Sequence, residues 1–355
     1  FYFCICLDYI QLILVIRIMK FRTEVSIIKD GFNLNVADNI VLLGSCFTKN
    51  IGTKLVDYKF NCDVNAFGVL YNPMSICRSL DSLLSGEDFP YEKYLFQNGE
   101  IWNSWLHSGD FSAPAREQCL HNIRKRAYEC NNAIKNAHAL ILTFGTNRCY
   151  EYNVDGSNVT VANCHKIPEQ RFNIHDMTVE EVVSVCEKTL TELFKLNEHL
   201  QVLFTVSPYR YAKYGFHGSN LSKSVLLLAV DETIKHFCGK CFYFPSYEIV
   251  KDELRDYRFY ADDMLHPSTQ AVDYIFERFS EYAFSYETFA FAQEWKKIVK
   301  AINHRPNYPD TKEYRAFVEK TQERLVFLSK KYANLAVEKE VEELNKRISN
   351  KQSNI

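Results

Sequence analysis

The sequence predicts an α/β protein whose sheet is mostly parallel and carries helices on both faces. Short runs of aliphatic and aromatic residues recur along the chain, and such runs are typical of strands that are buried on both sides. Longer segments with helical periodicity separate them, and an alternation of strands and helices implies parallel pairing. Glycine and polar residues follow the apolar runs, at the sheet edge where ligands bind in such folds.

Four apolar runs are predicted to form the strands of this sheet. They lie at residues 40–43, 139–144, 201–206 and 241–244. A further short strand is expected at residues 23–28. Glycine ends the first two runs, which suits a sharp turn after each strand.

Amphipathic segments between these runs are predicted to be helices. They lie at residues 48–58, 74–84, 116–136, 178–196, 222–237 and 267–283. Residues 86–114 are aromatic and irregular, and a loop of that length is usually functional or a lid. Residues 151–172 are expected to form a hairpin-like excursion. We therefore expect one domain over residues 19–290.

The last part of the chain, residues 291–355, is predicted to be a helical region. From residue 310 onward it is rich in Lys and Glu, and its apolar residues have helical spacing. One long helix and two helices joined near Asn334 both fit this pattern. Packing against the domain is favoured, and a coiled-coil arm that makes a homo-oligomer is the alternative.

Residues 1–18 are apolar but lack the basic start and the cleavage site of a signal peptide. The chain begins with Phe, whereas Met19 looks like an ordinary start. We therefore interpret residues 1–18 as an upstream extension and expect a cytoplasmic protein without stable membrane insertion. A membrane anchor formed by these residues is the alternative.

Composition excludes some classes of function. A net charge of -2 gives no basic excess for binding nucleic acid. The 12 cysteines are scattered apart from Cys238 and Cys241, and a zinc ribbon needs a second such pair. We expect free thiols, no metal and no cofactor.

Ser45 follows the first strand and precedes a helix. A serine at such a turn has the positive end of the helix behind it, which suits a nucleophile. Capping of the helix by Ser45 is the alternative, and on local spacing it is the commoner role.

Asp263 and His266 supply what a serine nucleophile needs. They are three residues apart, ahead of a helix with Pro267 in its first turn. That spacing can place the carboxylate on one imidazole nitrogen while the other accepts the proton of the nucleophile. This pair, together with Ser45, makes a catalytic site more plausible than a helix cap and a surface histidine.

Two further positions are candidates for an oxyanion hole. Asn147 follows the strand at residues 139–144, and its side-chain amide could donate to a developing oxyanion. Gly68 lies in the loop after the first helix and could donate its backbone N–H beside that of Ser45. A role as a turn residue is the alternative for Asn147.

Seven stretches of the sequence resemble the GSCFA family, a branch of the SGNH (GDSL-like) hydrolases. They are Gly44-Ser-Cys-Phe47, Phe67-Gly-Val-Leu-Tyr-Asn-Pro73, Asn163-Cys-His-Lys166, Val206-Ser-Pro208, Tyr243-Phe-Pro-Ser-Tyr-Glu248, Asp256-Tyr-Arg-Phe-Tyr260 and Asp263-Met-Leu-His266-Pro267. The resemblance covers about residues 20–290. It implies a flavodoxin-like three-layer α/β/α fold and hydrolase chemistry.

The same resemblance implies roles for individual residues. Ser45 would be the nucleophile, His266 the general base and Asp263 its orienting carboxylate. Gly68 and Asn147 would be oxyanion donors, although members of the family often lack an asparagine at the position of Asn147.

Four other residues near these motifs have expected roles. His107, His165 and Asn72 are candidates for binding the substrate, because they lie in loops flanked by polar and aromatic residues. Cys46 is expected to be a small buried thiol that points away from the nucleophile.

The predicted function is a serine esterase that cleaves an O-acyl ester on a carbohydrate or a related small molecule. Two alternatives remain at this point. One is a binding or scaffold module that keeps the fold and uses the C-terminal helix for assembly. The other is an O-acyltransferase.

Overall fold

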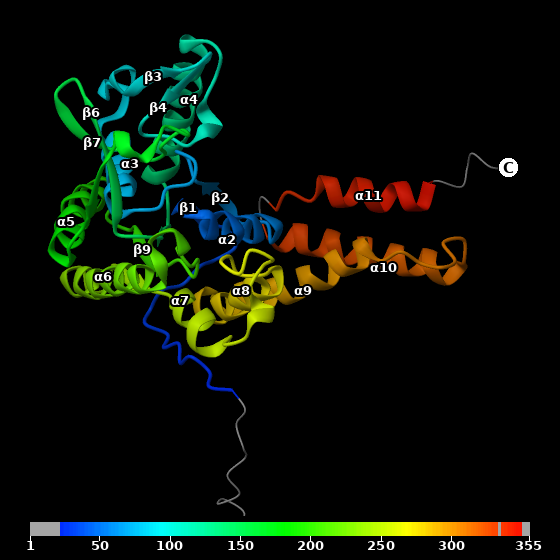
Figure 1. Ribbon diagram of the computed structural model, residues 1–355. Coiled ribbons are helices and arrows are strands. Elements are labelled where there is room, and N and C mark those ends of the chain that lie inside the picture. Colours follow the sequence, from blue (N-terminus) through cyan, green and yellow to red (C-terminus); the bar gives the residue numbers. More distant parts are fainter. Residues whose placement is uncertain (1–21, 333–334, 350–355) are drawn as a thin grey trace, which may run out of the picture.

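The computed structural model describes residues 22–332 and 335–349, so the expectation for residues 1–18 lies outside the described part (Figure 1). Within this part the central sheet has the strand order β10-β9-β5-β1-β2, and every pairing in it is parallel. Its strands are β1 (Asn39–Gly44), β2 (Asn61–Val64), β5 (Ala139–Phe144), β9 (Gln201–Val206) and β10 (Cys241–Tyr243). Counted along the chain this is the order 2-1-3-4-5, which is the flavodoxin-like arrangement.

Both faces of the sheet are buried under helices. On β1, Val41 and Leu43 contribute to one hydrophobic core, whereas Ile40 and Leu42 contribute to another. The first core is covered by α3 (Pro73–Ser85), α4 (Arg116–Lys135), α5 (Val179–Leu196) and α6 (Gly215–His236). The second is covered by α2 (Cys46–Asp57) and α8 (Thr269–Ala283). The predicted three-layer α/β/α fold is therefore confirmed.

Two strand predictions need correction. Residues 23–28 form no strand, because the Val25 backbone bonds to side chains: its N–H donates to Glu253 and its carbonyl accepts from Arg278. β2 lies where a loop was predicted. Its sequence, Asn-Cys-Asp-Val, is polar because β2 is an edge strand paired with β1 alone.

The long aromatic segment after α3 is more regular than predicted. It contains the hairpin β3 (Leu95–Asn98) and β4 (Ile101–Ser104). The later excursion forms the antiparallel strands β6 (Arg148–Val154), β7 (Ser157–Thr160) and β8 (Asn173–Asp176). A small aromatic core around Trp105 and Phe172 joins the two units, which lie together at the top of Figure 1.

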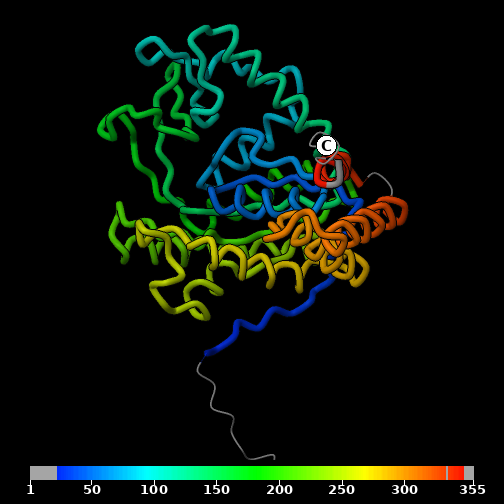
Figure 2. The backbone as a smooth tube through the Cα atoms, turned by 90° about the vertical axis from the view of Figure 1, so that its right-hand side faces the viewer, coloured from blue at the N-terminus to red at the C-terminus, as the bar shows by residue number. Residues whose placement is uncertain are grey.

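The C-terminal region consists of α9 (Tyr286–Asn303), α10 (Lys312–Lys331) and α11 (Glu338–Ser349). Of the two patterns left open for residues 310–351, the pair of helices is therefore correct. The three helices share a core around Trp295, and α10 and α11 run side by side away from the sheet (Figures 1 and 2). Trp295 donates its indole N–H to the Asp57 carbonyl at 2.7 Å, and Lys59 pairs with Glu340 at 2.8 Å. The predicted boundary at residue 290 falls inside α9.

Over residues 22–332 and 335–349, no helix has both the length and the apolarity that crossing a bilayer requires.

Candidate active site

The order of the strands places a switch point between β1 and β5. The chain leaves β1 toward β2 on one side, and the later strands extend from β5 on the other. Ligands of doubly wound folds bind outside the carboxyl ends of the strands at such a point. Ser45 follows β1 here, and Gly145 follows β5.

Ser45 is the N-cap of α2. Its side-chain oxygen accepts from the Phe47 N–H at 3.3 Å, and the residue is only 1% exposed. The preceding Gly44 has φ of +146°, and a Cβ there would lie 2.3 Å from the Thr143 carbonyl oxygen. Glycine is therefore needed for β1 to turn into α2 beside β5. The capping role of Ser45, which the sequence left open, is present in the structure.

Asp263 and His266 form a hydrogen-bonded pair. His266 Nδ1 donates to Asp263 Oδ2 at 2.5 Å. Asp263 Oδ1 accepts from the backbone N–H groups of Leu265 and His266, each at 2.9 Å. The side-chain bond from His266 and these two backbone bonds lower the pKa of Asp263 to about 2. The carboxylate therefore holds the imidazole so that Nε2 is left to accept a proton.

A group of tyrosines connects this pair with the ends of β5 and β9. The centre of the Tyr209 ring lies 4.3 Å from the centre of the His266 ring and 4.7 Å from that of the Tyr211 ring. The Tyr211 hydroxyl packs so closely on Gly145 that a Cβ there would lie 2.5 Å from it. Within the described ranges, this buried hydroxyl has no hydrogen-bond partner. These tyrosines were not predicted, although the loop after the third predicted strand was the signal that could have indicated them.

Within the described part of the chain, no hydrogen bond joins Ser45 and His266, because the Ser45 oxygen faces the Phe47 amide. The neighbouring Cys46 is half-buried rather than buried, which corrects the expectation for this thiol. Burial raises the pKa of the Cys46 thiol and Asp263 raises it further. The N–H groups of Phe47 and Cys46 and the Lys223 ammonium lower it.

The other predicted residues already have partners in the fold. Asn147 Nδ2 donates to the Met177 carbonyl at 2.7 Å, and the Gly68 N–H donates to the Asn65 carbonyl at 2.8 Å. Asn72 is the N-cap of α3, where its side-chain oxygen accepts from the Ser75 N–H at 2.8 Å.

The two candidate histidines come from different excursions: His107 follows β4, whereas His165 lies between β7 and β8. His107 is 1% exposed, stacks on Phe67 and shares a 2.9 Å hydrogen bond between Nδ1 and the Ser104 hydroxyl. Burial lowers its pKa to about 3. His165 lies nearby, with Nε2 at 2.9 Å from the Ser104 carbonyl oxygen. The structure thus buries both rings in a local core.

Two models of known protein families match the sequence of this chain. The model of the GSCFA family matches residues 39–279, and that of the GSCFA domain protein, C-terminal domain, matches residues 295–350. The chain belongs to the GSCFA family. The first match runs from β1 into α8, and the second contains the second half of α9 together with α10 and α11.

Solved structures give weaker likenesses to this GSCFA chain. One is "Clostridium thermocellum family 3 carbohydrate esterase", with 12% identity, a TM-score of 0.31, and coverage of 69% of this chain and 94% of that one. Another is an acetyl xylan esterase (Est2A) from the rumen bacterium Butyrivibrio proteoclasticus, with 12% identity, a TM-score of 0.36, and coverage of 70% and 64%. Scores this low carry no information about the chemistry of this chain. A comparison with curated protein sequences returns no match.

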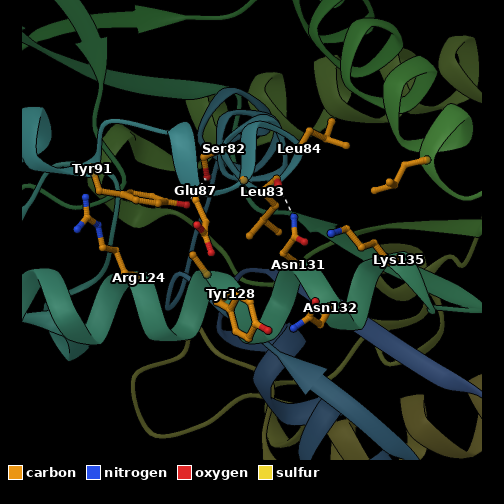
Figure 3. Close-up of a pocket in the computed structure, with 13 residues that line it drawn as sticks. Ser82, Leu83, Leu84, Glu87, Tyr91, Arg124, Tyr128, Asn131, Asn132 and Lys135 are labelled. Carbon is orange, nitrogen blue, oxygen red and sulfur yellow. Dashed lines mark hydrogen bonds between the residues drawn. The ribbon is translucent and has the colours of Figure 1, made fainter.

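This GSCFA protein has one hollow between α3 and α4 and another that lies beside His266. A cavity of about 650 Å³ lies between α3 and α4, lined by Tyr91, Arg124 and Asn131 among others (Figure 3). None of the predicted site residues lines it. A second hollow, of about 410 Å³, contains Tyr209 and therefore lies next to His266; Arg210 also lines it.

Lys223 of α6 is buried beneath this edge of the sheet. Its ammonium donates to the carbonyl oxygens of Gly145 at 2.5 Å and Ser207 at 2.7 Å, which fixes the ends of β5 and β9. Burial lowers its pKa from 10.5 to about 7. This lysine was not predicted, because its position inside a predicted helix gives no indication that its side chain is buried.

The buried Lys223 should make stability depend on pH. Between pH 7 and 10.5 the unfolded chain holds a proton that folded Lys223 lacks, so the free energy of unfolding should rise with pH there. The slope reaches at most about 1.4 kcal/mol per pH unit. Urea unfolding at several pH values should show this rise in the wild type and lose it in Lys223→Met. The exposed Lys235→Met on the same helix is the control, and equal slopes in wild type and Lys223→Met would contradict the burial of a shifted lysine.

Gly68 should tolerate no side chain. It has φ of +76°, and a Cβ would lie 1.8 Å from the Ser108 hydroxyl oxygen. We expect Gly68→Ala to lower the free energy of unfolding by about 2–4 kcal/mol. Gly86→Ala is the matched control, because Gly86 has φ of +64° but nothing within 4 Å of its Cβ position, so it should cost about 1 kcal/mol. Equal decreases in the free energy of unfolding for the two variants, measured by urea unfolding, would show that backbone strain at positive φ, rather than the clash with Ser108, destabilises Gly68→Ala.

Proposed function

We propose that this GSCFA protein is a hydrolase that cleaves O-acyl esters through an acyl-enzyme intermediate. The observation that supports this most is the hydrogen-bonded pair of Asp263 and His266 at the carboxyl edge of a parallel sheet. A carboxylate on Nδ1 prepares Nε2 to take a proton from a nucleophile and stabilises the imidazolium that forms. The turn from β1 to α2 then supplies the nucleophile at the switch point.

The reaction would proceed in two transfers. The nucleophile of the turn attacks the acyl carbonyl, His266 accepts its proton and passes it to the departing alcohol, and the acyl group stays on the enzyme. Water, deprotonated by His266, then attacks the acyl carbon and releases the acid. Ser45 is the nucleophile predicted from the sequence, and its hydroxyl would have to leave the cap bond to Phe47 before it could attack.

The oxyanion of the intermediate needs donors at the same edge. In the first turn of α2, the N–H groups of Phe47 and Thr48 are bonded to the side chain and the carbonyl of Ser45. We therefore assign this role to the N–H of Cys46, which lies at the positive end of the helix dipole. The assignments of Gly68 and Asn147 are less well supported, because the Gly68 N–H and one amide hydrogen of Asn147 are already bonded.

We propose an O-acylated carbohydrate as the substrate. The hollow next to His266 is lined by the rings of Tyr209, Phe216, Tyr247, Tyr257 and Tyr260. Aromatic faces can pack against the apolar face of a sugar, and the tyrosine hydroxyls can bond to its polar groups.

A second reading, a binding module with the same fold, is favoured by one observation. Ser45 is buried, and among the residues that the structure describes it makes no hydrogen bond with His266. An enzyme whose only nucleophile was Ser45 would have to rearrange this turn before each reaction.

Release of an acyl group from a purified ester separates the two readings. The protein should release p-nitrophenol from p-nitrophenyl acetate and acetate from at least one acetylated glycan, with heat-denatured protein as the control. Binding of the glycan without release of acetate, together with no hydrolysis of any simple ester, would favour the binding module.

A further inference from the structure

Adjacent residues of the β1–α2 turn are oriented differently. Ser45 is 1% exposed and its hydroxyl oxygen accepts from the Phe47 N–H as the helix cap. Cys46 is the first residue of α2, and it is half-buried. Since a nucleophile must reach a substrate, Cys46 is the better placed of the two.

The surroundings of Cys46 are those of the site. Cys46 directly follows Ser45 and the carboxyl end of β1, at the switch point of the sheet. Asp263 raises the pKa of its thiol and Lys223 lowers it, so both lie within electrostatic range of the thiol. The centre of the Tyr209 ring lies 4.3 Å from that of the His266 ring, and Cys46 and Asp263 both raise the pKa of Tyr209. The thiol therefore lies at the same edge of the sheet as the histidine–carboxylate pair.

A second feature of this place points to a ligand. The Tyr211 hydroxyl is buried against Gly145 at the end of β5 and has no hydrogen-bond partner within residues 22–332 and 335–349. Buried polar groups in folded proteins are almost always hydrogen-bonded. A bound substrate, or the oxygen of its acyl group, would satisfy this donor.

We propose that the thiol of Cys46, rather than the hydroxyl of Ser45, is the nucleophile of the site. This inference rests on the proposed acyl transfer and names the atom that performs it. Ser45 is then a positioning residue, which holds the first turn of α2 so that Cys46 faces His266.

The chemistry balances with an ester and water as the only reactants. The Cys46 sulfur forms a bond to the acyl carbon, its proton passes to His266 Nε2, and the carbon–oxygen bond of the ester breaks. The departing alkoxide takes the proton from His266 and leaves as the alcohol. Water then attacks the thioester, gives a proton to His266, and the thiol regains that proton as the acid departs.

The thiol is protonated at rest, because burial and Asp263 outweigh the N–H groups and Lys223 that favour the thiolate. It therefore requires His266 as a base, in contrast to thiols that are already ionised.

The test is to trap the acyl-enzyme and identify the acylated atom. Full-length protein is mixed with p-nitrophenyl acetate, quenched in acid, and its mass is measured before and after neutral hydroxylamine, which cleaves a thioester much faster than an oxygen ester. We expect a hydroxylamine-sensitive adduct on the peptide that contains Cys46. Cys46→Ala should lose the adduct and at least about 10^3-fold in kcat/KM, whereas Ser45→Ala should still form it.

Cys62→Ala is the matched control, because Cys62 is also a half-buried thiol but lies on β2, and its adduct and rate should equal those of the wild type. If Cys46→Ala does not fold, alkylation of the wild type with iodoacetamide gives the same information: modification of Cys46 should abolish turnover. Substrate should slow that modification.

A hydroxylamine-resistant adduct that persists in Cys46→Ala and vanishes in Ser45→Ala would overturn the assignment and leave the hydrolase intact. If the wild type neither forms an adduct nor turns over any ester, the proposed function fails and this inference fails with it.

Discussion

Asp263→Asn should lower kcat by about 10^3–10^4-fold while the protein stays folded. The asparagine oxygen can replace Asp263 Oδ1, so the backbone bonds from Leu265 and His266 and the turn they hold should persist. Its NH₂ group then faces His266 Nδ1 in place of a carboxylate oxygen. The imidazole must accept there and carry its proton on Nε2, which prevents it from acting as a base.

Steady-state hydrolysis of p-nitrophenyl acetate measures this effect, with circular dichroism to verify the fold. Asp262→Asn is the control, because Asp262 is the exposed neighbour on the same turn and should keep the wild-type rate. A rate for Asp263→Asn within about tenfold of the wild type would show that the carboxylate does not set the state of His266.

Arg278→Met should lower the free energy of unfolding by about 3–5 kcal/mol. The Glu253 carboxylate is completely buried, and Arg278 donates to both of its oxygens, at 3.1 Å and 2.9 Å. Arg278 also donates to the Val25 carbonyl at 2.8 Å, which ties the first described segment to α8. Removing the guanidinium would leave a buried carboxylate that lacks its main counter-charge.

Urea unfolding measures this loss, and Arg258→Met provides the comparison. Arg258 is 71% exposed at the side chain and lies 3.7 Å from Asp256, so the change should cost less than about 1 kcal/mol. Similar losses in both variants would mean that the buried pair of Arg278 and Glu253 adds no more to stability than an exposed pair.

The central fold could be predicted because its strands are buried on both faces. Residues 40–43 and 139–144 are continuous apolar runs, and the helices between the strands have clear periodicity. β2 was missed because it is a polar edge strand, and β3 and β4 were missed because their aromatic residues pack in a local core rather than in an alternating pattern. These strands depend on partners that lie elsewhere in the chain.

The site could be predicted where local spacing determines geometry. Asp263 and His266 are three residues apart on one turn, so their pairing depends on a single loop. Tyr211 and Lys223 could not be found in this way, because both depend on tertiary packing. Lys223 reaches the site through the packing of α6 against the sheet, and Tyr211 lies in the loop after β9 and packs on Gly145.

The identity of the nucleophile depends on a feature that sequence spacing does not contain. Ser45 and Cys46 are adjacent, and either can follow a strand into a helix. The N-cap geometry of α2 turns the serine side chain back to the Phe47 amide, and this is one reason why we propose Cys46 as the nucleophile. The expectation of a buried Cys46 was wrong, because Cys46 is half-buried as the first residue of α2.

The effect of His266→Gln on ester hydrolysis shows directly whether His266 is the base of an acyl-transfer site. Glutamine keeps a polar side chain at this position but cannot accept and release a proton at neutral pH. We expect wild-type protein to hydrolyse p-nitrophenyl acetate with turnover and His266→Gln to lose about 10^2–10^4-fold in kcat/KM. Equal rates for the wild type and His266→Gln would contradict this role of His266.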